Sequence, residues 1–272
     1  MIRTAITISL VPQARQGPFV FHGDLAGSIT KAAELGYDAV EIFPPAADAL
    51  DAPDLQRMTI DAGVKVAAVG SGAGFVVHKL TLTDPDAAAR QRAVDFVKEI
   101  IDIAGPLRAP AIVGSMQGRH AEGDRPGALD RLADTLATLG VHARGHGVPL
   151  LYEPLNRYET NIFNRQPEAA DFLRSRGVQN VKVLCDLFHM NIEEADVPAA
   201  LRAVGPRRLG HVHFVDSNRL APGMGHTDFA PIARALKEMG YQGYASAECF
   251  PMPDAQTAAR RTIEAYRRIF HV

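Results

Sequence analysis

Short runs of β-branched and other apolar residues alternate with longer amphipathic patterns along the whole 272-residue chain. Such alternation is typical of βα units, in which parallel strands are joined by crossover helices. Eight runs are predicted as strands, at residues 3–9, 38–43, 65–70, 110–114, 149–153, 181–186, 209–214 and 244–248. Eight consecutive units without a low-complexity linker predict an α/β fold, a (β/α)8 TIM barrel, with residues 1–272 as a single domain. A doubly wound open sheet is the alternative.

The helical patterns support the same fold. Examples are "DLAGSITKAAELGY", "DAAARQRAVDFVKEIIDIAG" and "DAQTAARRTIEAYRRIF", in which apolar residues recur at helical spacing. Several patterns end in a glycine just before the next strand, as in "ELGYDAVEIF" and "GHGVPLLYE", and glycine accepts the left-handed backbone that closes a helix. Because the active site of a TIM barrel lies where its strands end, functional residues are expected at the strand ends.

The composition of the chain limits the binding partners and the cellular location that can be expected for the protein. Lys and Arg total 29 against 31 for Asp and Glu, a formal net charge of −2, which predicts no nucleic-acid partner. The longest apolar runs fall short of a bilayer span, so no membrane association is expected. The apolar start of the chain is interpreted as a strand rather than a signal peptide. Two cysteines are too few for a disulfide framework, so a cytoplasmic location is expected.

Ionisable side chains stand at the ends of the last four predicted strands: Glu153 after "LLY", Asp186 after "VKVLC", His213 in "HVH" and Glu248 after "YASA". Buried carboxylates are costly unless they are paired, hydrogen-bonded or bound to a cation, so three of them beside an imidazole indicate a metal site. The oxygen-rich set favours Mn²⁺, Mg²⁺ or Co²⁺. His211 and His213 point to the same face of their strand. His213 is nearer the rim and is the preferred ligand, whereas His211 is expected to lie deeper and to support it.

Four segments, "YEPLNRYET", "CDLFHMNIEE", "HVHFVDSNRLAPGMGHTDF" and "SAECF", occur in that order between residues 150 and 250. They resemble the D-tagatose 3-epimerase family of ketose 3-epimerases, which are xylose isomerase-like TIM barrels. The resemblance implies one divalent metal ion, Mn²⁺ or else Mg²⁺ or Co²⁺, and a homodimer or homotetramer. Its implied ligands are Glu153, Asp186, His213 and Glu248, and its implied substrate-binding residues are Glu159, His189 and Arg219.

The resemblance also implies a reaction. A ketose is epimerised at C3 when the acidic proton beside its carbonyl is removed and a proton returns to the opposite face. Glu153 and Glu248 are the implied catalytic pair, one acting as base and the other as acid. A cation would stabilise the negative charge of the cis-enediolate. His189 and Arg219 are implied donors to substrate oxygens, and Glu159 is implied to bind a hydroxyl near C1.

Other functions compete with this interpretation. A sugar 1,2-isomerase, or an enzyme acting on an inosose or another keto-sugar, would use the same enediol chemistry. A DNA repair nuclease of the endonuclease IV type would need further histidine ligands after the third and fourth strands, where this chain has "VGSG" and "VGSM". A sugar-binding barrel without catalysis is the third alternative.

Individual residues also have plainer interpretations. Arg219 could form a loop salt bridge with Asp216, Glu159 could be an exposed loop residue, and His189 could be a structural support. Because the chain has no tryptophan, any stacking wall of a sugar pocket must come from Phe, Tyr or Met. The candidates are Phe43, Phe75, Met116 and Phe250, and ordinary core packing is the plainer interpretation of each. The segment at 70–75 is interpreted as a flexible βα loop, because it lacks the Lys-Ser/Thr of the alternative, a phosphate-binding loop. The segment at 115–120 could gate the pocket or contact substrate.

Overall fold

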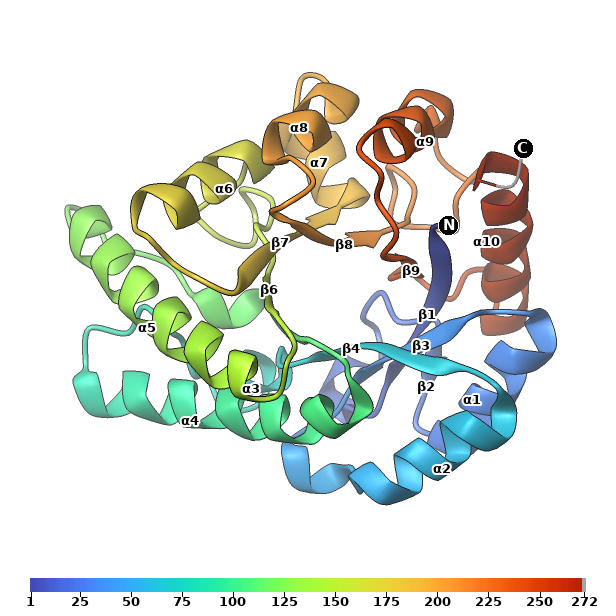
Figure 1. The fold of residues 1–272 in the computed structure, drawn as a ribbon, viewed down its shortest axis with the longest axis horizontal. Coiled ribbons are helices and arrows are strands. Elements are labelled where there is room, and N and C mark those ends of the chain that lie inside the picture. The colour runs from blue at the N-terminus through green and yellow to red at the C-terminus, as the bar shows by residue number, and fades with distance from the viewer. Residues whose placement is uncertain (271–272) are drawn as a thin grey trace.

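The computed structural model describes residues 1–270, and within them eight parallel strands close into a barrel surrounded by helices (Figure 1). The barrel runs in the order β1-β3-β4-β5-β6-β7-β8-β9, and pairing of β9 with β1 closes it. Every pairing is between parallel strands. The chain therefore has the TIM-barrel fold that the alternating pattern predicts, and the open-sheet alternative is wrong.

The described strands are β1 (Arg3–Ser9), β2 (Phe21–His22), β3 (Ala39–Phe43), β4 (Lys65–Gly70), β5 (Ala111–Val113), β6 (Leu150–Tyr152), β7 (Val181–Asp186), β8 (Leu209–His213) and β9 (Tyr244–Ala247). The helices are α1 (Leu25–Leu35), α2 (Ala52–Ala62), α3 (Ala73–Val76), α4 (Ala87–Ala104), α5 (Arg125–Gly145), α6 (Gln166–Ser175), α7 (Leu187–Glu193), α8 (Val197–Val204), α9 (Phe229–Glu238) and α10 (Ala255–Phe270). No helix within residues 1–270 is long and apolar enough to cross a membrane.

The eight strands expected from the sequence are all present, with ends that differ by one residue at most. The extra strand, β2, pairs with β1 through Ile8 and Phe21. It was not predicted because two residues are too few to show an alternating pattern. Glu153 and Glu248 directly follow β6 and β9, so the strand ends deliver these carboxylates to the same rim of the barrel.

Two layers of buried side chains hold the strands in place. The main apolar layer lies between the strands and the outer helices. The barrel interior holds smaller apolar clusters, one of Ala5, Ala39 and Ala67 and another that includes Phe43 and Leu184. The remaining interior space is occupied by buried polar side chains, and those polar groups form the site described next.

Candidate metal centre and active site

Four side chains converge at the carboxyl ends of the last four strands. Glu153, Asp186, His213 and Glu248 are all buried, and each offers one ligand atom within 4.8 Å of the others. Asp186 ends β7 and also caps α7, because its Oδ1 accepts the backbone N–H of Phe188 at 2.7 Å. Its second oxygen, Oδ2, is left to face the cluster. The structure thus brings together the four residues that the sequence nominated as ligands.

The imidazole of His213 is aimed at the three carboxylates. Its Nδ1 lies 3.2 Å from Asp186 Oδ2, 3.4 Å from Glu153 Oε1 and 3.5 Å from Glu248 Oε2. Its Nε2 lies 3.0 Å from Glu41 Oε1 on the opposite side of the ring. Because a carboxylate only accepts, Nε2 carries a proton and donates it to Glu41, which leaves Nδ1 as the atom that can bind a cation.

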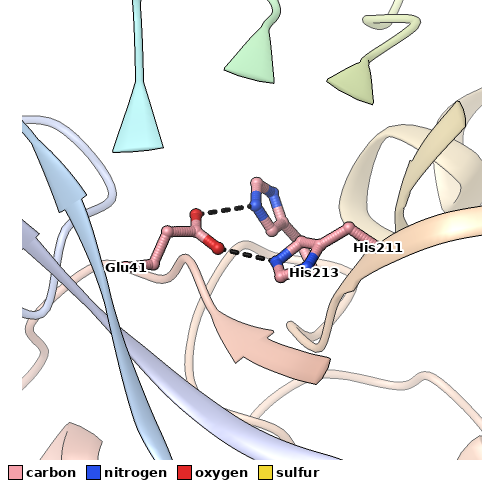
Figure 2. A group of neighbouring side chains, drawn as sticks. All are labelled: Glu41, His211 and His213. Atoms are coloured by element: carbon pink, nitrogen blue, oxygen red, sulfur yellow. Dashed lines mark hydrogen bonds and ion pairs between the residues drawn. The ribbon is translucent and has the colours of Figure 1, made fainter. Parts of the chain in front are cut away.

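Glu41 was not identified from the sequence, yet it holds the His213 and His211 imidazoles by hydrogen bonds beneath the site. It lies in the middle of β3, fully buried, and its Oε2 accepts from His211 Nε2 at 2.6 Å. Figure 2 shows the Glu41 carboxylate held between the two imidazoles. Burial raises the pKa of Glu41, but the adjacent His213 and His211 outweigh burial and hold that pKa well below its usual range. Glu41 is therefore an ionised anchor for His213.

The donor set fits a divalent cation. Three buried carboxyl groups face one another, and Glu153 Oε1 has no hydrogen-bond partner although it is buried. Burial, and then the neighbouring Glu153 and Asp186, raise the pKa of Glu248 to about 8, although His213 and Arg219 oppose that rise. A cation at this point would satisfy the orphaned oxygen and allow all three carboxyl groups to be ionised. Carboxylate oxygens with one imidazole suit Mn²⁺ or Mg²⁺.

Gly114 leaves the space that the Glu153 carboxylate occupies. A Cβ atom at Gly114 would lie 2.5 Å from Glu153 Oε2, well inside normal contact distance. Glu153 is also fixed through its backbone N–H, which donates to the carbonyl of Val113 at 2.9 Å. A side chain at position 114 would therefore force the Glu153 carboxylate to shift from its place in the cluster.

His189 presents a proton donor to the cluster. It is fully buried on α7, and its Nδ1 accepts the backbone N–H of Asn156 at 3.3 Å. Since a backbone N–H can only donate, Nδ1 is the unprotonated nitrogen and Nε2 carries the proton. That Nε2 has no hydrogen-bond partner, and it lies 3.8 Å from Asp186 Oδ2 and 3.9 Å from Glu153 Oε1. An unsatisfied donor beside the carboxylates is suited to a substrate oxygen.

Arg219 contacts both Glu248, one of the candidate metal ligands, and Glu159, the last of the predicted substrate-binding residues. Its Nη2 donates to Glu248 Oε2 at 2.7 Å, its Nη1 lies 3.5 Å from Glu159 Oε1, and its guanidinium stands 4.8 Å from the centre of the Phe188 ring. Glu159, which remains about two-fifths exposed, thereby lies at the edge of the site.

The alternative that Arg219 pairs with the side chain of Asp216 is wrong. The Asp216 carboxylate instead accepts backbone N–H groups, including those of Ser217, Gly223 and Thr227, all at 3.0 Å or less. Asp216 thus folds the loop that carries Arg219, while the Arg219 guanidinium extends to Glu248.

A cavity of about 330 Å³ opens above the carboxylates. Of the residues considered from the sequence as a stacking wall, Phe43 lines this cavity. The ring of Phe19 packs against the ring of Phe43, with their centres 4.5 Å apart. Met116 lies in the apolar core instead, and neither Phe75 nor Phe250 belongs to the described lining. The loops at 70–75 and 115–120 each contribute, and so does the segment from Val11 to Phe19, which the sequence did not single out because it carries no motif. The lining is Val11, Gln13, Ala14, Gln16, Gly17, Pro18, Phe19, Phe43, Gly70, Ser71, Gly72, Ala73, Val76, Ile112, Gly114, Ser115, Glu153, Leu155, Glu159, Arg219 and Glu248.

Known proteins with similar sequences share this architecture. Residues 29–269 match the family model described as xylose isomerase-like TIM barrel. A D-psicose 3-epimerase of Enterocloster bolteae is 34% identical over 232 residues, which cover 82% of this chain and 75% of that protein. An L-ribulose 3-epimerase of Mesorhizobium japonicum is 32% identical over 234 residues, which cover 84% of this chain and 76% of that protein. The crystal structure of D-psicose 3-epimerase with D-tagatose from Clostridium cellulolyticum H10 has a TM-score of 0.81 at 24% identity and covers 99% of both chains.

Proposed function

We propose, from the premise that this chain belongs to the ketose 3-epimerase family of xylose isomerase-like TIM barrels, that it interconverts free ketoses at C3 with the help of a divalent metal ion. Membership of this family makes the protein a carbohydrate epimerase. The observation that supports metal dependence is the convergence of His213 Nδ1 with three buried carboxyl groups. Mn²⁺ is the proposed ion, with Mg²⁺ and Co²⁺ as alternatives.

The proposed metal ligands are Glu153, Asp186, His213 and Glu248. When bound, the cation supplies Lewis-acid stabilisation of the negative charge on the cis-enediolate of the substrate. Glu41 keeps the His213 ring in the orientation and tautomer that this role needs, because it accepts the Nε2 proton.

Glu153 and Glu248 are the proposed acid/base pair. They follow β6 and β9, so they flank Asp186 and His213, which end the two strands between. In one direction Glu153 takes the C3 proton and Glu248 returns a proton to the opposite face of C3, and the reverse reaction exchanges these roles.

The other polar residues are proposed to bind substrate. His189 Nε2–H lacks a partner in the protein, so it is available to donate to the C2 oxygen. Arg219 contacts Glu248 and Glu159, so it can orient the acid/base group and donate to a substrate oxygen at the same time. Glu159 accepts from Asn156 Nδ2 at 2.9 Å and is proposed to bind a hydroxyl near C1.

The lining of the cavity favours neutral sugars over sugar phosphates. Arg219 is the one cationic side chain in the described lining, and Glu248 and Glu159 already engage it. The loop at 70–75 contributes backbone and the Ser71 hydroxyl, and that hydroxyl donates to the carbonyl of Ile112 at 2.6 Å. A phosphate dianion would find no free cation there, so a free ketose such as psicose, tagatose or ribulose is the proposed substrate.

A single exchange experiment tests the proposal. The Mn²⁺-loaded protein is incubated in D₂O with fructose, psicose, tagatose, sorbose and ribulose, and NMR follows deuterium uptake. Uptake at C3 together with the C3 epimer is the expected result. Uptake at C1 with aldose formation would identify a 1,2-isomerase instead, and the absence of exchange despite bound metal would refute epimerisation of simple ketoses.

Two variants test the assigned roles. Glu153→Gln and Glu248→Gln are each expected to abolish epimerisation while the barrel still folds, as judged by circular dichroism. Glu238→Gln is the matched control, since Glu238 is exposed on α9 and pairs with Arg202. Turnover near the wild-type rate in either site variant would remove that residue from the acid/base pair.

We also expect a homodimer or homotetramer in a reducing cytoplasm. Both cysteines, Cys185 and Cys249, are free and buried, which agrees with that compartment. Size-exclusion chromatography with light scattering measures the oligomeric state directly, and a monomer would contradict this expectation.

A further inference from the structure

A second cluster of metal-ligating side chains lies outside the barrel, on neighbouring helices. His142 Nε2 and His146 Nε2, from the end of α5, lie 2.6 Å and 2.8 Å from the same oxygen, Asp102 Oδ1 on α4. One ligand atom from each of these three residues lies within 4.8 Å of the others. None of the three lines the cavity or contacts the four candidate ligands in the barrel.

The positions of these residues on two neighbouring helices bring their side chains together. His142 and His146 are four residues apart, so they share one face of a helix. Figure 1 shows α4 and α5 side by side on the outside of the barrel, and Asp102 stands near the end of α4. Helices of a TIM barrel run opposite to the strands, so both helix ends lie at the end of the barrel away from the carboxylate site.

Gly105 makes the approach of His146 feasible. A Cβ atom at Gly105 would lie 2.3 Å from His146 Nδ1, so any other residue at this position would collide with the imidazole. Gly105 has φ −54, a conformation that every residue type can adopt, so its backbone does not require glycine. Space for the His146 ring is the local reason for a glycine here.

We propose that Asp102, His142 and His146 form a surface binding site for a Zn²⁺-type transition metal ion. Two imidazoles and one carboxylate are donors that Zn²⁺, Ni²⁺ and Cu²⁺ accept. No Lys or Arg of the described chain forms an ion pair with Asp102. A metal ion between the helices would therefore not have to displace a Lys or Arg side chain. Three protein ligands leave a coordination position open to water.

The required rearrangement is small. Ligands at about 2.1 Å from a tetrahedral ion stand roughly 3.4 Å from one another, whereas the present Nε2 to Oδ1 separations are 2.6 Å and 2.8 Å. Each Nε2 must therefore move less than 1 Å farther from Asp102 Oδ1, and the three ligand atoms already lie within 4.8 Å of one another. All three are between about one-third and one-half exposed, so they have room to move. Each Nε2 must give up its proton when the ion binds.

The test compares Zn²⁺ binding by four proteins loaded with Mn²⁺: the wild type, His142→Asn/His146→Asn, Asp102→Asn and the control His78→Asn. His78 is exposed and lies outside the cluster. Each protein is equilibrated with Zn²⁺, passed through a desalting column and analysed for metal content, and calorimetry gives the affinity. Exchange of Zn²⁺ into the barrel is common to all four, so the difference between them reports on the surface cluster.

The wild type and His78→Asn are expected to retain one more equivalent of Zn²⁺ than the double variant, and Asp102→Asn is expected to bind that ion at least tenfold more weakly. Zn²⁺ should also raise the melting temperature of the wild type more than that of the double variant, because the ion links α4 to α5. Equal Zn²⁺ content and equal thermal shifts in all four proteins would overturn the proposal and leave the cluster as a hydrogen-bonded helix contact.

Discussion

Replacement of Glu41 by glutamine is the sharpest test of how the site is held. Glu41 accepts from His213 Nε2 at 3.0 Å and from His211 Nε2 at 2.6 Å, using one oxygen for each. Glutamine has the same shape but keeps only one acceptor oxygen, and its NH₂ group would face the proton of the other imidazole. One histidine must therefore lose its partner or change its tautomer.

The size of the effect follows from these contacts. Loss of the carboxylate partner of a metal-ligating histidine typically weakens metal binding by about 10- to 100-fold, which corresponds to roughly 1.4 to 2.8 kcal/mol. The buried imidazole left without an acceptor costs about 1 to 3 kcal/mol of folding stability. Glu41→Gln should therefore bind Mn²⁺ about 10- to 100-fold more weakly and unfold at a lower temperature than the wild type.

Two measurements check this result. Mn²⁺ affinity is obtained by calorimetry or from the signal of free Mn²⁺ in electron paramagnetic resonance, and stability by thermal unfolding of the metal-free protein. His211→Asn is the matched control, because it leaves the contact between Glu41 and His213 in place and should weaken Mn²⁺ binding less. A folded Glu41→Gln protein that binds Mn²⁺ within twofold of the wild type would refute the anchoring role of Glu41.

Three further predictions concern the same site. Since burial raises the pKa of Glu248 to about 8, metal binding below that pH must displace its proton, so Mn²⁺ affinity should rise about tenfold per pH unit towards pH 8 and then level off. A flat calorimetric profile between pH 6 and 8 would contradict this. Gly114→Ala should lower kcat at least tenfold by pushing against Glu153 Oε2, which lies 2.5 Å from the added Cβ, whereas Gly145→Ala, with nothing within 4 Å, should keep wild-type kinetics. Arg219→Lys should raise KM about tenfold because lysine cannot reach Glu248 and Glu159 with one planar group; an unchanged KM would argue against substrate contact.

The sequence predicts the rim of the barrel well because the geometry of parallel strands is simple. Once the strands are placed, residues that follow them directly must share one end of the barrel. Glu153, Asp186 and Glu248 therefore come together without any knowledge of side-chain packing, and the described distances agree. A shift of one residue at a strand end, as at β6, does not change which rim receives Glu153.

The interior of the barrel could not be predicted in the same way. Glu41 is the one ionisable residue in the apolar segment "AVEIF". A single carboxylate in a strand does not indicate which residues it contacts. The partners of Glu41 belong to β8, whereas the strands paired with β3 are β1 and β4, so its contacts cross the barrel rather than follow the sheet. Likewise, Phe19 joins the cavity wall from a segment with no periodic pattern. Contacts of this kind depend on barrel closure, which local sequence does not encode.

The two halves of the chain contribute differently to the cavity. The charged side chains of its lining, Glu153, Glu159, Arg219 and Glu248, come from the segments after β6, β8 and β9, whereas the loops after β1, β4 and β5 contribute uncharged side chains and backbone. Beneath the cavity, Glu41 on β3 is a charged group that the first half supplies. In the proposed mechanism the charged groups set the reaction, because their roles are to bind a cation and to move protons, and such groups tolerate little displacement. Apolar walls set which sugar fits, and small changes of volume alter that selection by about 1 to 3 kcal/mol. Substitutions at Phe19 or Val11 should therefore change the order of kcat/KM among ketoses, while deuterium exchange at C3 persists. The family resemblance is strongest between residues 150 and 250, so it predicts the chemistry better than the substrate.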